Sequence, residues 1–215
     1  MEQTILTNNQ QTSLSEISKH DYLVENFYFT GGTVLSEFYY KHRLSEDLDF
    51  FTTNDYIDDI QILKFIKTNK LKTKALEVEY TNSRYQKIII FKYKNQEPLK
   101  IDFAYFPLEH IGEFKKYKNI KFSSYQDIAV NKLNSLSERK RGRDYLDLYY
   151  ILTKEKLDIK QLEILYRTKY DMYAPKNALA KAFSSVLEAS DQPRFLGDIK
   201  WSKIQKFFLE LSKKV

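Results

Sequence analysis

The sequence predicts an α+β protein in two parts, an α/β unit over residues 1–122 and a helical unit over residues 123–215. Alternating apolar and polar residues, the pattern typical of strands, occur only in the first part, for example at residues 85–93 and 99–105. Everything after Ser123 has helical spacing of its apolar residues. A chain of 215 residues, 42% of them hydrophobic, can bury a core of the size that this plan needs.

The first part alternates between helices and strands. Thr52-Thr53-Asn54 is a helix-start signal, and the segment after it has acids early and lysines late, as the helix dipole favours. Asn82-Ser83 and Lys94-Asn95-Gln96 indicate turns between the last three strands. We expect helices at residues 13–24, 33–41 and 55–70, and strands at residues 26–29, 47–51, 74–80, 85–93 and 99–105.

The second part shows helical patterns alone. Its first residues, Ser123-Ser124-Tyr125-Gln126, resemble a capping box, which marks the start of a helix. Pro175 and Pro193 fall in breaks between the helical patterns. We expect helices at residues 124–139, 143–154, 159–170, 176–189 and 200–213.

Composition excludes several classes of function. Cysteine is absent, which excludes disulfide scaffolds, thiol catalysis and cysteine-ligated zinc. The three histidines are far apart in the sequence, which argues against a histidine-rich metal site. No apolar run approaches the roughly 20 residues that span a bilayer, and the first residues lack a signal-peptide pattern. We therefore expect a soluble, cytoplasmic protein with no membrane partner.

The acid pair Asp47 and Asp49 is the most informative feature. Residues two apart in a strand point to the same face, so the two carboxylates project together while Leu48 and Phe50 point into the core. Two such carboxylates repel each other unless a cation lies between them. Mg²⁺ prefers one or two carboxylates completed by phosphate oxygens and water. The pair predicts a metal–nucleotide platform; the alternative is that one aspartate is exposed or caps a turn.

Two features strengthen this prediction. Gly31-Gly32 lies between a strand and a helix, where backbone N–H groups can meet phosphate, although an ordinary turn would also use glycine there. Asp102 lies in an otherwise apolar strand, where burying it unpaired is costly. If that strand neighbours the strand of Asp47 and Asp49, three carboxylates converge, as in a two-metal site for phosphoryl transfer. If it is an edge strand, Asp102 faces water.

The helical part contains charged residues on apolar helix faces. Lys132 falls within the apolar face of its helix, so it must reach solvent, pair with an acid or meet a phosphate. Asp144 and Asp147 share a face of the next helix, and Asp147 is flanked by apolar residues. Asp147 therefore needs a cation, either Lys132 or an arginine. A plain buried ion pair that locks the two helices together is the alternative to a catalytic role, and Asp144 also suits an N-cap.

A dense basic loop joins these two helices, and its charged residues are Arg139, Lys140, Arg141 and Arg143. The chain carries a net charge of +6 at pH 7, which permits contact with a polyanion. The loop is a candidate for binding the NTP or a nucleic-acid acceptor. A solvated helix end whose charge complements the helix dipole explains the same residues.

Two blocks of the sequence resemble the AbiEii-type nucleotidyltransferase toxins. These toxins belong to the DNA polymerase β-like nucleotidyltransferase superfamily, alongside the MenT toxins. The first block is Phe-Thr-Gly31-Gly32-Thr33-x-Leu followed by His-Arg43-Leu-Ser45-Glu-Asp47-Leu-Asp49-Phe. The second is Asp-Ile-Ala-Val-Asn-Lys132-Leu followed by Arg139 and Arg143-Asp144-Tyr-Leu-Asp147. The similarity runs from about residue 27 to residue 152.

The resemblance implies a mixed-sheet nucleotidyltransferase core and a C-terminal helical bundle that contributes to the active site. It implies that the nucleotide is bound by Gly31, Gly32, Thr33, Arg43, Ser45 and Lys132. The catalytic residues that it implies are Asp47, Asp49, Asp102, Lys132, Asp144 and Asp147. The first three of these would hold Mg²⁺ or Mn²⁺. The Gly-Gly pair departs from the Gly-Ser of many superfamily members, so Thr33 would supply the hydroxyl contact.

We therefore expect a Mg²⁺-dependent toxin that transfers a nucleoside monophosphate from an NTP to an acceptor such as tRNA. The basic loop at residues 139–143 would bind the acceptor, and a cognate antitoxin would restrain the enzyme. One alternative keeps the fold but uses the γ-phosphate, as a phosphotransferase does. The other is a catalytically silent module that binds RNA or protein.

Overall fold

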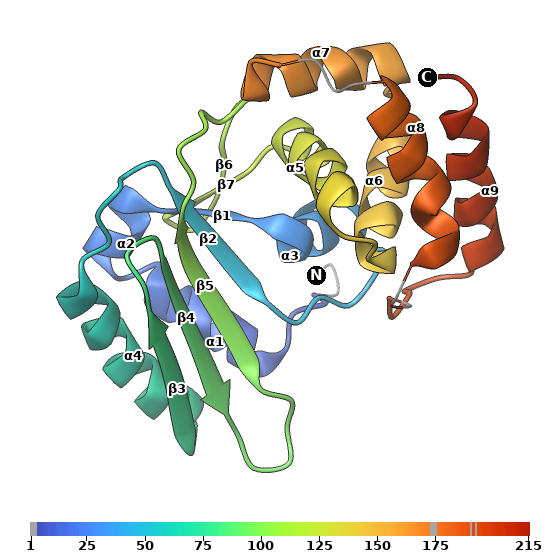
Figure 1. Ribbon diagram of the computed structural model, residues 1–215. Helices are drawn as coiled ribbons and strands as arrows, with labels where there is room; N and C mark the ends of the chain where they lie inside the picture. The colour runs from blue at the N-terminus through green and yellow to red at the C-terminus, as the bar shows by residue number, and fades with distance from the viewer. Residues whose placement is uncertain (1–3, 173–175, 190, 192) are drawn as a thin grey trace. The chain divides into compact units, whose positions relative to one another are not determined.

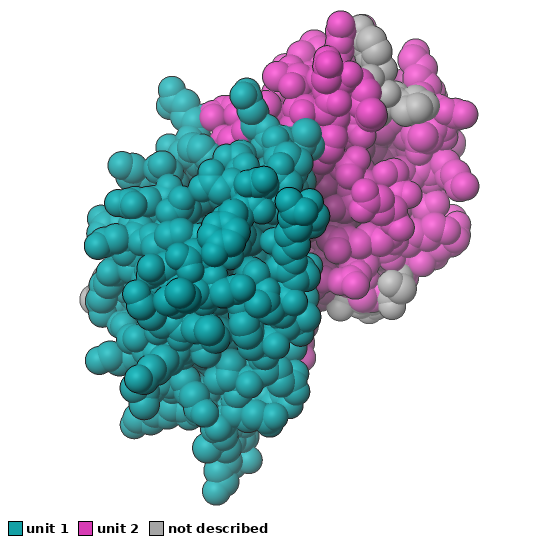
Figure 2. All heavy atoms as spheres, turned by 60° about the vertical axis from the view of Figure 1, so that its left-hand side comes forward, with its two compact units in different colours: residues 1–37, 45–109, 113–123 teal, residues 38–44, 110–112, 124–215 magenta. Residues whose placement is uncertain are grey.

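The structure is a computed structural model that describes residues 4–172, 176–189, 191 and 193–215, so the predicted break at Pro175 lies outside it. The chain forms two compact units, which Figure 2 shows in two colours. Unit 1 comprises Met1–Glu37, Ser45–Glu109 and Glu113–Ser123, and unit 2 comprises Phe38–Leu44, His110–Gly112 and Ser124–Val215. No helix among the described residues is long and apolar enough to cross a membrane.

Unit 1 is built on a mixed β-sheet, as the resemblance implies (Figure 1). Two of its pairings, β2 with β5 and β1 with β7, are parallel and the others are antiparallel. The strand order is β3-β4-β5-β2-β1-β7-β6. The strands are β1 (Tyr28–Thr30), β2 (Leu48–Thr52), β3 (Glu77–Asn82), β4 (Gln86–Lys92), β5 (Leu99–Tyr105), β6 (Lys115–Tyr117) and β7 (Ile120–Phe122).

Three phenylalanines cross the middle of this sheet and fix its register. Phe50 of β2 stacks on Phe29 of β1, with ring centroids 4.9 Å apart, and on Phe103 of β5, at 5.2 Å. All three side chains are buried. Since side chains alternate between the faces of a strand, burying this aromatic row sends the neighbouring residues Asp49 and Asp102 to the opposite face.

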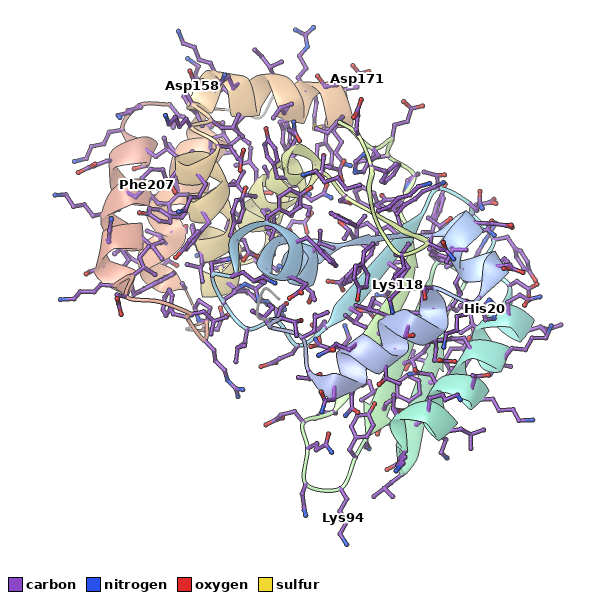
Figure 3. All side chains as sticks on the ribbon, turned by 180° about the vertical axis from the view of Figure 1, so that it is seen from behind. His20, Lys94, Lys118, Asp158, Asp171 and Phe207 are labelled. Carbon is purple, nitrogen blue, oxygen red and sulfur yellow. The ribbon has the colours of Figure 1, made fainter. Side chains whose placement is uncertain are left out.

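The helices of unit 1 are α1 (Asn8–Ile17), α2 (Asp21–Asn26), α3 (Gly31–Leu35) and α4 (Asp59–Thr73). The chain continues from α3 into a π-helical turn, η1 (Ser36–Tyr40). Helices α1 and α4 lie side by side on one face of the sheet, and Lys94 projects from the turn between β4 and β5 (Figures 1 and 3). The single helix predicted at residues 13–24 is wrong. A capping box between Thr7 and Gln10 starts α1 earlier, and an extended His20 separates it from α2.

Unit 2 contains the helices that the sequence predicts. They are α5 (Tyr125–Glu138), α6 (Gly142–Lys154), α7 (Ile159–Tyr170), α8 (Lys176–Ser184) with the 3₁₀ turn η2 (Ser185–Glu188), and α9 (Trp201–Ser212). Tyr145 of α6 packs edge-on against Phe208 of α9 and donates a hydrogen bond of 2.6 Å to the carbonyl of Ala182 in α8. Asp158 and Asp171 mark the two ends of α7 in Figure 3, and Asp158 caps its first turn.

A buried ion pair joins α7 to α5. Lys169 Nζ lies 2.5 Å from Asp127 Oδ1, and neither side chain is exposed. The backbone N–H of Ile111 donates to the same carboxylate oxygen at 3.1 Å. A buried charge is tolerated only when it is paired in this way, so the pair commits α7 to one position on α5.

We expect Lys169→Met to lower the free energy of unfolding by about 3–5 kcal/mol, because the buried Asp127 then loses the ammonium group that pairs with it. Urea denaturation would measure the loss. The control is Lys160→Met on the exposed side of the same helix, which we expect to change stability by less than about 0.5 kcal/mol. Equal effects of the two substitutions would contradict the role of this ion pair.

Candidate active site

The predicted site residues form two groups, one in each unit, and each group is described by itself. In unit 1, β2 and β5 pair in parallel with Asp49 directly beside Asp102. The conditional prediction that these strands are neighbours is thus confirmed, and the edge-strand alternative is wrong because β4 covers the other side of β5. Asp47 precedes the first residue of β2 and is half-buried. Leu48 and Phe50 point into the core, as expected.

Gly31 is required where α3 begins. Its φ is +81°, in the left-handed region that favours glycine. A Cβ placed on it would lie 2.4 Å from Asp49 Oδ2. The backbone of Gly31 therefore packs against the carboxylate of Asp49, closer than any other residue type allows. Gly32 is buried in the first turn of α3.

Thr33 and Ser45 hold the segment that leads into Asp47. Thr33 Oγ1 is buried, 2.5 Å from the carbonyl of Asp47 and 2.8 Å from Ser45 Oγ. Since the carbonyl can only accept and a hydroxyl has one proton, Thr33 donates to the carbonyl and accepts from Ser45. Gln10 of α1 donates to the carbonyls of Ser45 and Glu46, at 2.8 and 3.2 Å. These hydrogen bonds fix the backbone of the segment that contains Asp47.

Asp102 is 5% exposed, and its two oxygens have different surroundings. Oδ2 accepts a hydrogen bond from Lys100 Nζ, whereas the buried Oδ1 has no hydrogen-bond partner among the described residues. Burial raises the pKa of Asp102, and the neighbouring Lys100 only partly offsets this. A buried carboxylate oxygen without a partner is costly, and a bound cation would remove that cost.

No group of three or more histidine, aspartate or glutamate side chains is close enough to hold a metal ion in the part of the chain that the structure describes. The candidate platform in unit 1 is therefore the pair Asp49 and Asp102, with Asp47 beside it in sequence. Mg²⁺ commonly takes only one or two protein carboxylates, and fills its other positions with phosphate oxygens and water. The two neighbouring carboxylates of this face therefore suit the coordination that Mg²⁺ prefers.

In unit 2, Asp147 is fully buried at the centre of a charged cluster. Arg43 forms a bidentate pair with it, with Nε 2.7 Å from Oδ1 and the second nitrogen 2.9 Å from Oδ2. Lys132 Nζ lies 2.7 Å from Oδ2, and His42 Nε2 lies 2.8 Å from Oδ1. Burial raises the pKa of Asp147, but Arg43 and Lys132 outweigh it and hold that pKa well below the usual range. We expected Asp147 to pair with Lys132 or with an arginine, and it pairs with both Lys132 and Arg43.

Asp144 lies beside Asp147 on α6 and shares its lysine. Lys132 Nζ is 2.7 Å from Asp144 Oδ1, and Arg139 Nε is 2.9 Å from Oδ2. Burial raises the pKa of Asp144, but Lys132 and Arg139 lower it below the usual value of 3.8. Lys132 is thus an 8% exposed lysine paired with two acids, which is the acid-pairing outcome expected from its position in an apolar face. Asp144 is not the N-cap of α6; Arg141 is.

Part of the positive charge of the basic loop between α5 and α6 is paired with acids of unit 2. Besides the pairing of Arg139 with Asp144, Lys140 Nζ forms an ion pair with Glu188. Arg139 and Lys140 are still nearly half-exposed as side chains, and Arg141 is exposed. The loop therefore keeps its side chains accessible while some of its positive charge is neutralised.

Sequence reasoning missed three residues that the structure brings into these groups. Lys100 lies two residues before Asp102 on the same strand face, which the period of two could have indicated. His42 stands beside Arg43 in the first motif, but nothing in the sequence signals its contact with Asp147. Gln10 belongs to the capping box that starts α1, but nothing in the sequence signals its hydrogen bonds to the carbonyls of Ser45 and Glu46.

Comparison with known proteins fits this geometry. The nucleotidyl transferase AbiEii toxin family of type IV toxin–antitoxin systems matches residues 14–214. The chain belongs to this family. The match confirms the resemblance and extends it beyond residues 27–152, to the last helix. The protein is accordingly a toxin-type nucleotidyltransferase, and membership implies an NTP substrate and a cognate antitoxin.

Individual relatives of this AbiEii-family chain are distant. The uncharacterized protein aq_aa25 of Aquifex aeolicus (strain VF5) is 28% identical over 151 residues, which cover 69% of this chain and 68% of that protein. The crystal structure of JHP933 from Helicobacter pylori has a TM-score of 0.65 at 15% identity, and covers 97% of this chain and 92% of that one. A second H. pylori crystal structure has a TM-score of 0.66, also at 15% identity, with 97% and 95% covered. Both structures show the fold.

We expect Gly31→Ala to lower the free energy of unfolding by about 2–4 kcal/mol. About 1–2 kcal/mol comes from the left-handed backbone, and the remainder from the collision of the new Cβ with Asp49. Gly197→Ala is the matched control, because Gly197 also has a positive φ but would place its Cβ in open space. Chemical denaturation of both variants measures the difference. Equal losses would mean that the Asp49 carboxylate does not pack against Gly31.

We expect Asp147→Asn to lower the free energy of unfolding by about 3–5 kcal/mol at pH 7, because Arg43 and Lys132 lose a buried counter-charge. A carboxylate with a depressed folded-state pKa adds stability above its unfolded pKa, and that stability is lost as the pH falls. The gap between the wild type and the variant should therefore shrink below about pH 3.8, the usual value for the unfolded chain. Denaturation from pH 7 downward tests this; a gap that widened on acidification would contradict it.

Proposed function

We propose that this AbiEii-family enzyme transfers a nucleoside monophosphate from an NTP to tRNA at the β2–β5 face of unit 1, with Mg²⁺ or Mn²⁺ as cofactor. The observation that carries the proposal is the register of β2 and β5, which sets Asp49 beside Asp102. Like charges placed together on a buried face are destabilising in themselves. Such a placement suits a site that binds a cation together with phosphate groups.

The residues of unit 1 fit a divalent cation. Asp102 Oδ1 is buried and has no hydrogen-bond partner in the part of the chain that the structure describes, and the backbone of Gly31 packs closely against Asp49 Oδ2 and limits its movement. We assign the holding of the cation to the neighbours Asp49 and Asp102, and Asp47 stays a predicted third ligand. The cation would neutralise the negative charge that gathers on the transferred phosphate.

The remaining steps use the protein's own groups. In the proposed reaction, a hydroxyl of the acceptor attacks the α-phosphorus of the NTP and pyrophosphate leaves. We assign the acceptance of the proton of that hydroxyl to Asp102, which lies beside Asp49. We assign phosphate binding to the backbone N–H groups of Gly31, Gly32 and Thr33, whose segment begins α3 without a side-chain cap at Thr30. The hydroxyl contact expected of Thr33 is wrong, because that hydroxyl is buried and donates to the carbonyl of Asp47. The contacts of Arg43, Ser45 and Lys132 with the nucleotide stay predictions.

Unit 2 suggests a refinement of the roles of Lys132, Asp144 and Asp147. Their charges are already satisfied by one another, by Arg43 and by Arg139. Such a cluster holds its lysine in one place, and preorganisation of this kind is how enzymes stabilise developing charge. We propose that Asp144 and Asp147 act by positioning Lys132 and Arg43.

The acceptor is the least constrained part of the proposal. The net charge of +6 and the accessible basic loop at residues 139–143 favour a polyanion, and tRNA is the polyanion that we propose. A phosphotransferase on the same fold would move the γ-phosphate instead. Family membership favours an enzyme over a silent binding module.

We expect that label from an α-phosphorus-labelled NTP will appear on tRNA, and that Asp49→Asn will lower kcat/KM at least about 100-fold while the protein stays folded. The reason is that the amide can neither neutralise a cation nor replace the negative charge of the carboxylate. Asp55→Asn, an exposed aspartate of the same unit, is the control and should keep near-normal activity.

If label from a γ-phosphorus-labelled NTP appeared on the acceptor, the enzyme would transfer a phosphate group and not a nucleotide. Full activity of Asp49→Asn would remove the carboxylate face as the active site. Label that reaches protein but never tRNA would retain the reaction and change its acceptor.

A further inference from the structure

Lys100 has an unusual position among the carboxylates of unit 1. It precedes Asp102 by two residues on β5, so both side chains project from the same face of the sheet. Its Nζ donates to Asp102 Oδ2, and the ion pair leaves Asp102 Oδ1 buried with no hydrogen-bond partner among the described residues. The side chain of Lys100 is 37% exposed, so the ammonium enters the carboxylate face from its solvent side.

The ammonium acts on more than one acid. Besides its contact with Asp102, Lys100 interacts electrostatically with Asp47 and Asp49. One positive charge thus lies within reach of three negative ones. It lowers their mutual repulsion without neutralising it, and it occupies one oxygen of the carboxylate that the proposed function assigns to a cation.

We propose that Lys100 is a built-in counter-ion of this carboxylate face, and that a divalent cation binds there by displacing the lysine from Asp102. The inference rests on the proposed function, since it concerns the cation of the same site. An ammonium on Oδ2 and a divalent cation on Oδ1 of the same carboxylate would repel each other strongly at such a short separation, so the cation loosens the lysine from Asp102. A lysine is a compact charge on a flexible four-carbon stem, and its partial exposure leaves it room to turn outward.

Displacement couples the cation to the nucleotide. A divalent cation that arrives alone must expel the lysine and leave it without a partner, so it binds weakly. A triphosphate that arrives with the cation offers the displaced ammonium a new acidic partner, so the pair binds well together. Because such coupling is reciprocal, Lys100 makes the cation and the nucleotide depend on each other.

The test is a titration of each folded protein with MnCl₂, with free Mn²⁺ followed by electron paramagnetic resonance, in the absence and presence of ATP. Lys100→Met should bind Mn²⁺ at least about tenfold more tightly than the wild type when ATP is absent, because the competing charge is gone. The increase in Mn²⁺ affinity caused by ATP should shrink in this variant. Lys100→Arg, which keeps the charge, should stay within about threefold of the wild type.

Lys92→Met is the matched control. Lys92 is also a sheet lysine paired with two carboxylates, Glu77 and Glu79, and its side chain is 41% exposed. It stands on β4, away from the register of Asp49 with Asp102, so Mn²⁺ binding should not change. Lys100→Gln removes the same charge with a polar side chain, and replaces Lys100→Met if the latter fails to fold.

Equal Mn²⁺ affinities of the wild type and the neutral Lys100 variants, with binding plainly measurable, would overturn the role of Lys100 and leave the metal platform intact. Weaker binding by these variants would overturn it as well, since Lys100 would then support the carboxylates for the cation. No Mn²⁺ binding by any of the proteins, with or without ATP, would remove the platform of the proposed function and the role of Lys100 together.

Discussion

The parallel pairing of β2 with β5 is the constraint on which the carboxylate face depends. It is fixed from the apolar side, where Phe29, Phe50 and Phe103 stack across three strands. On the opposite face of the sheet, the same register places Asp49 beside Asp102. A shift of one residue would put the acids on the apolar face and the aromatic rings on the carboxylate face, and this cost is far larger than the repulsion between two carboxylates. The core therefore maintains an arrangement of charges that is unfavourable by itself.

In unit 2, by contrast, the buried acids are paired with basic side chains. Asp144 and Asp147 are surrounded by fixed cations from three parts of the chain, and every contact is a direct ion pair or hydrogen bond. Asp102 in unit 1, by contrast, has one carboxylate oxygen without a hydrogen-bond partner among the residues that the structure describes. The first arrangement is a closed network, which rigidifies the helices, whereas the second is open and can accept a ligand.

The sequence predicts those features that depend on local period or local chemistry. Alternation along β5 is enough to set Asp102 apart from the apolar face, and the position of Lys132 on an apolar helix face is enough to demand a partner. It does not predict which strands become neighbours, because pairing is decided by contacts far apart in the chain. Arg43 and His42 reach Asp147 across more than 100 residues, so no local pattern announces them.

Some local structure also escaped prediction, for reasons of length and capping. β6 and β7 have three residues each, too few to show a period, and β6 begins with two lysines. The apolar pattern of residues 13–24 runs on across Ser18 and His20, although the backbone of His20 is extended and ends the helical path there. The capping box of Thr7 and Gln10 sets the start of α1, whereas His20 breaks the helical path without any side-chain cap of its own.

The division of the chain into units has a topological consequence. Unit 2 includes two short segments that interrupt the sequence of unit 1. They are Phe38–Leu44 and His110–Gly112, and the first of them contains Arg43. The path from the Gly31 turn to the Asp47 strand thus passes through the other unit before it returns. No single cut of the polypeptide separates the two units, so a fragment that ends at Ser123 would contain the carboxylate face together with two loops whose own surroundings are missing. A fragment that begins at Ser124 would in turn lack two segments of unit 2.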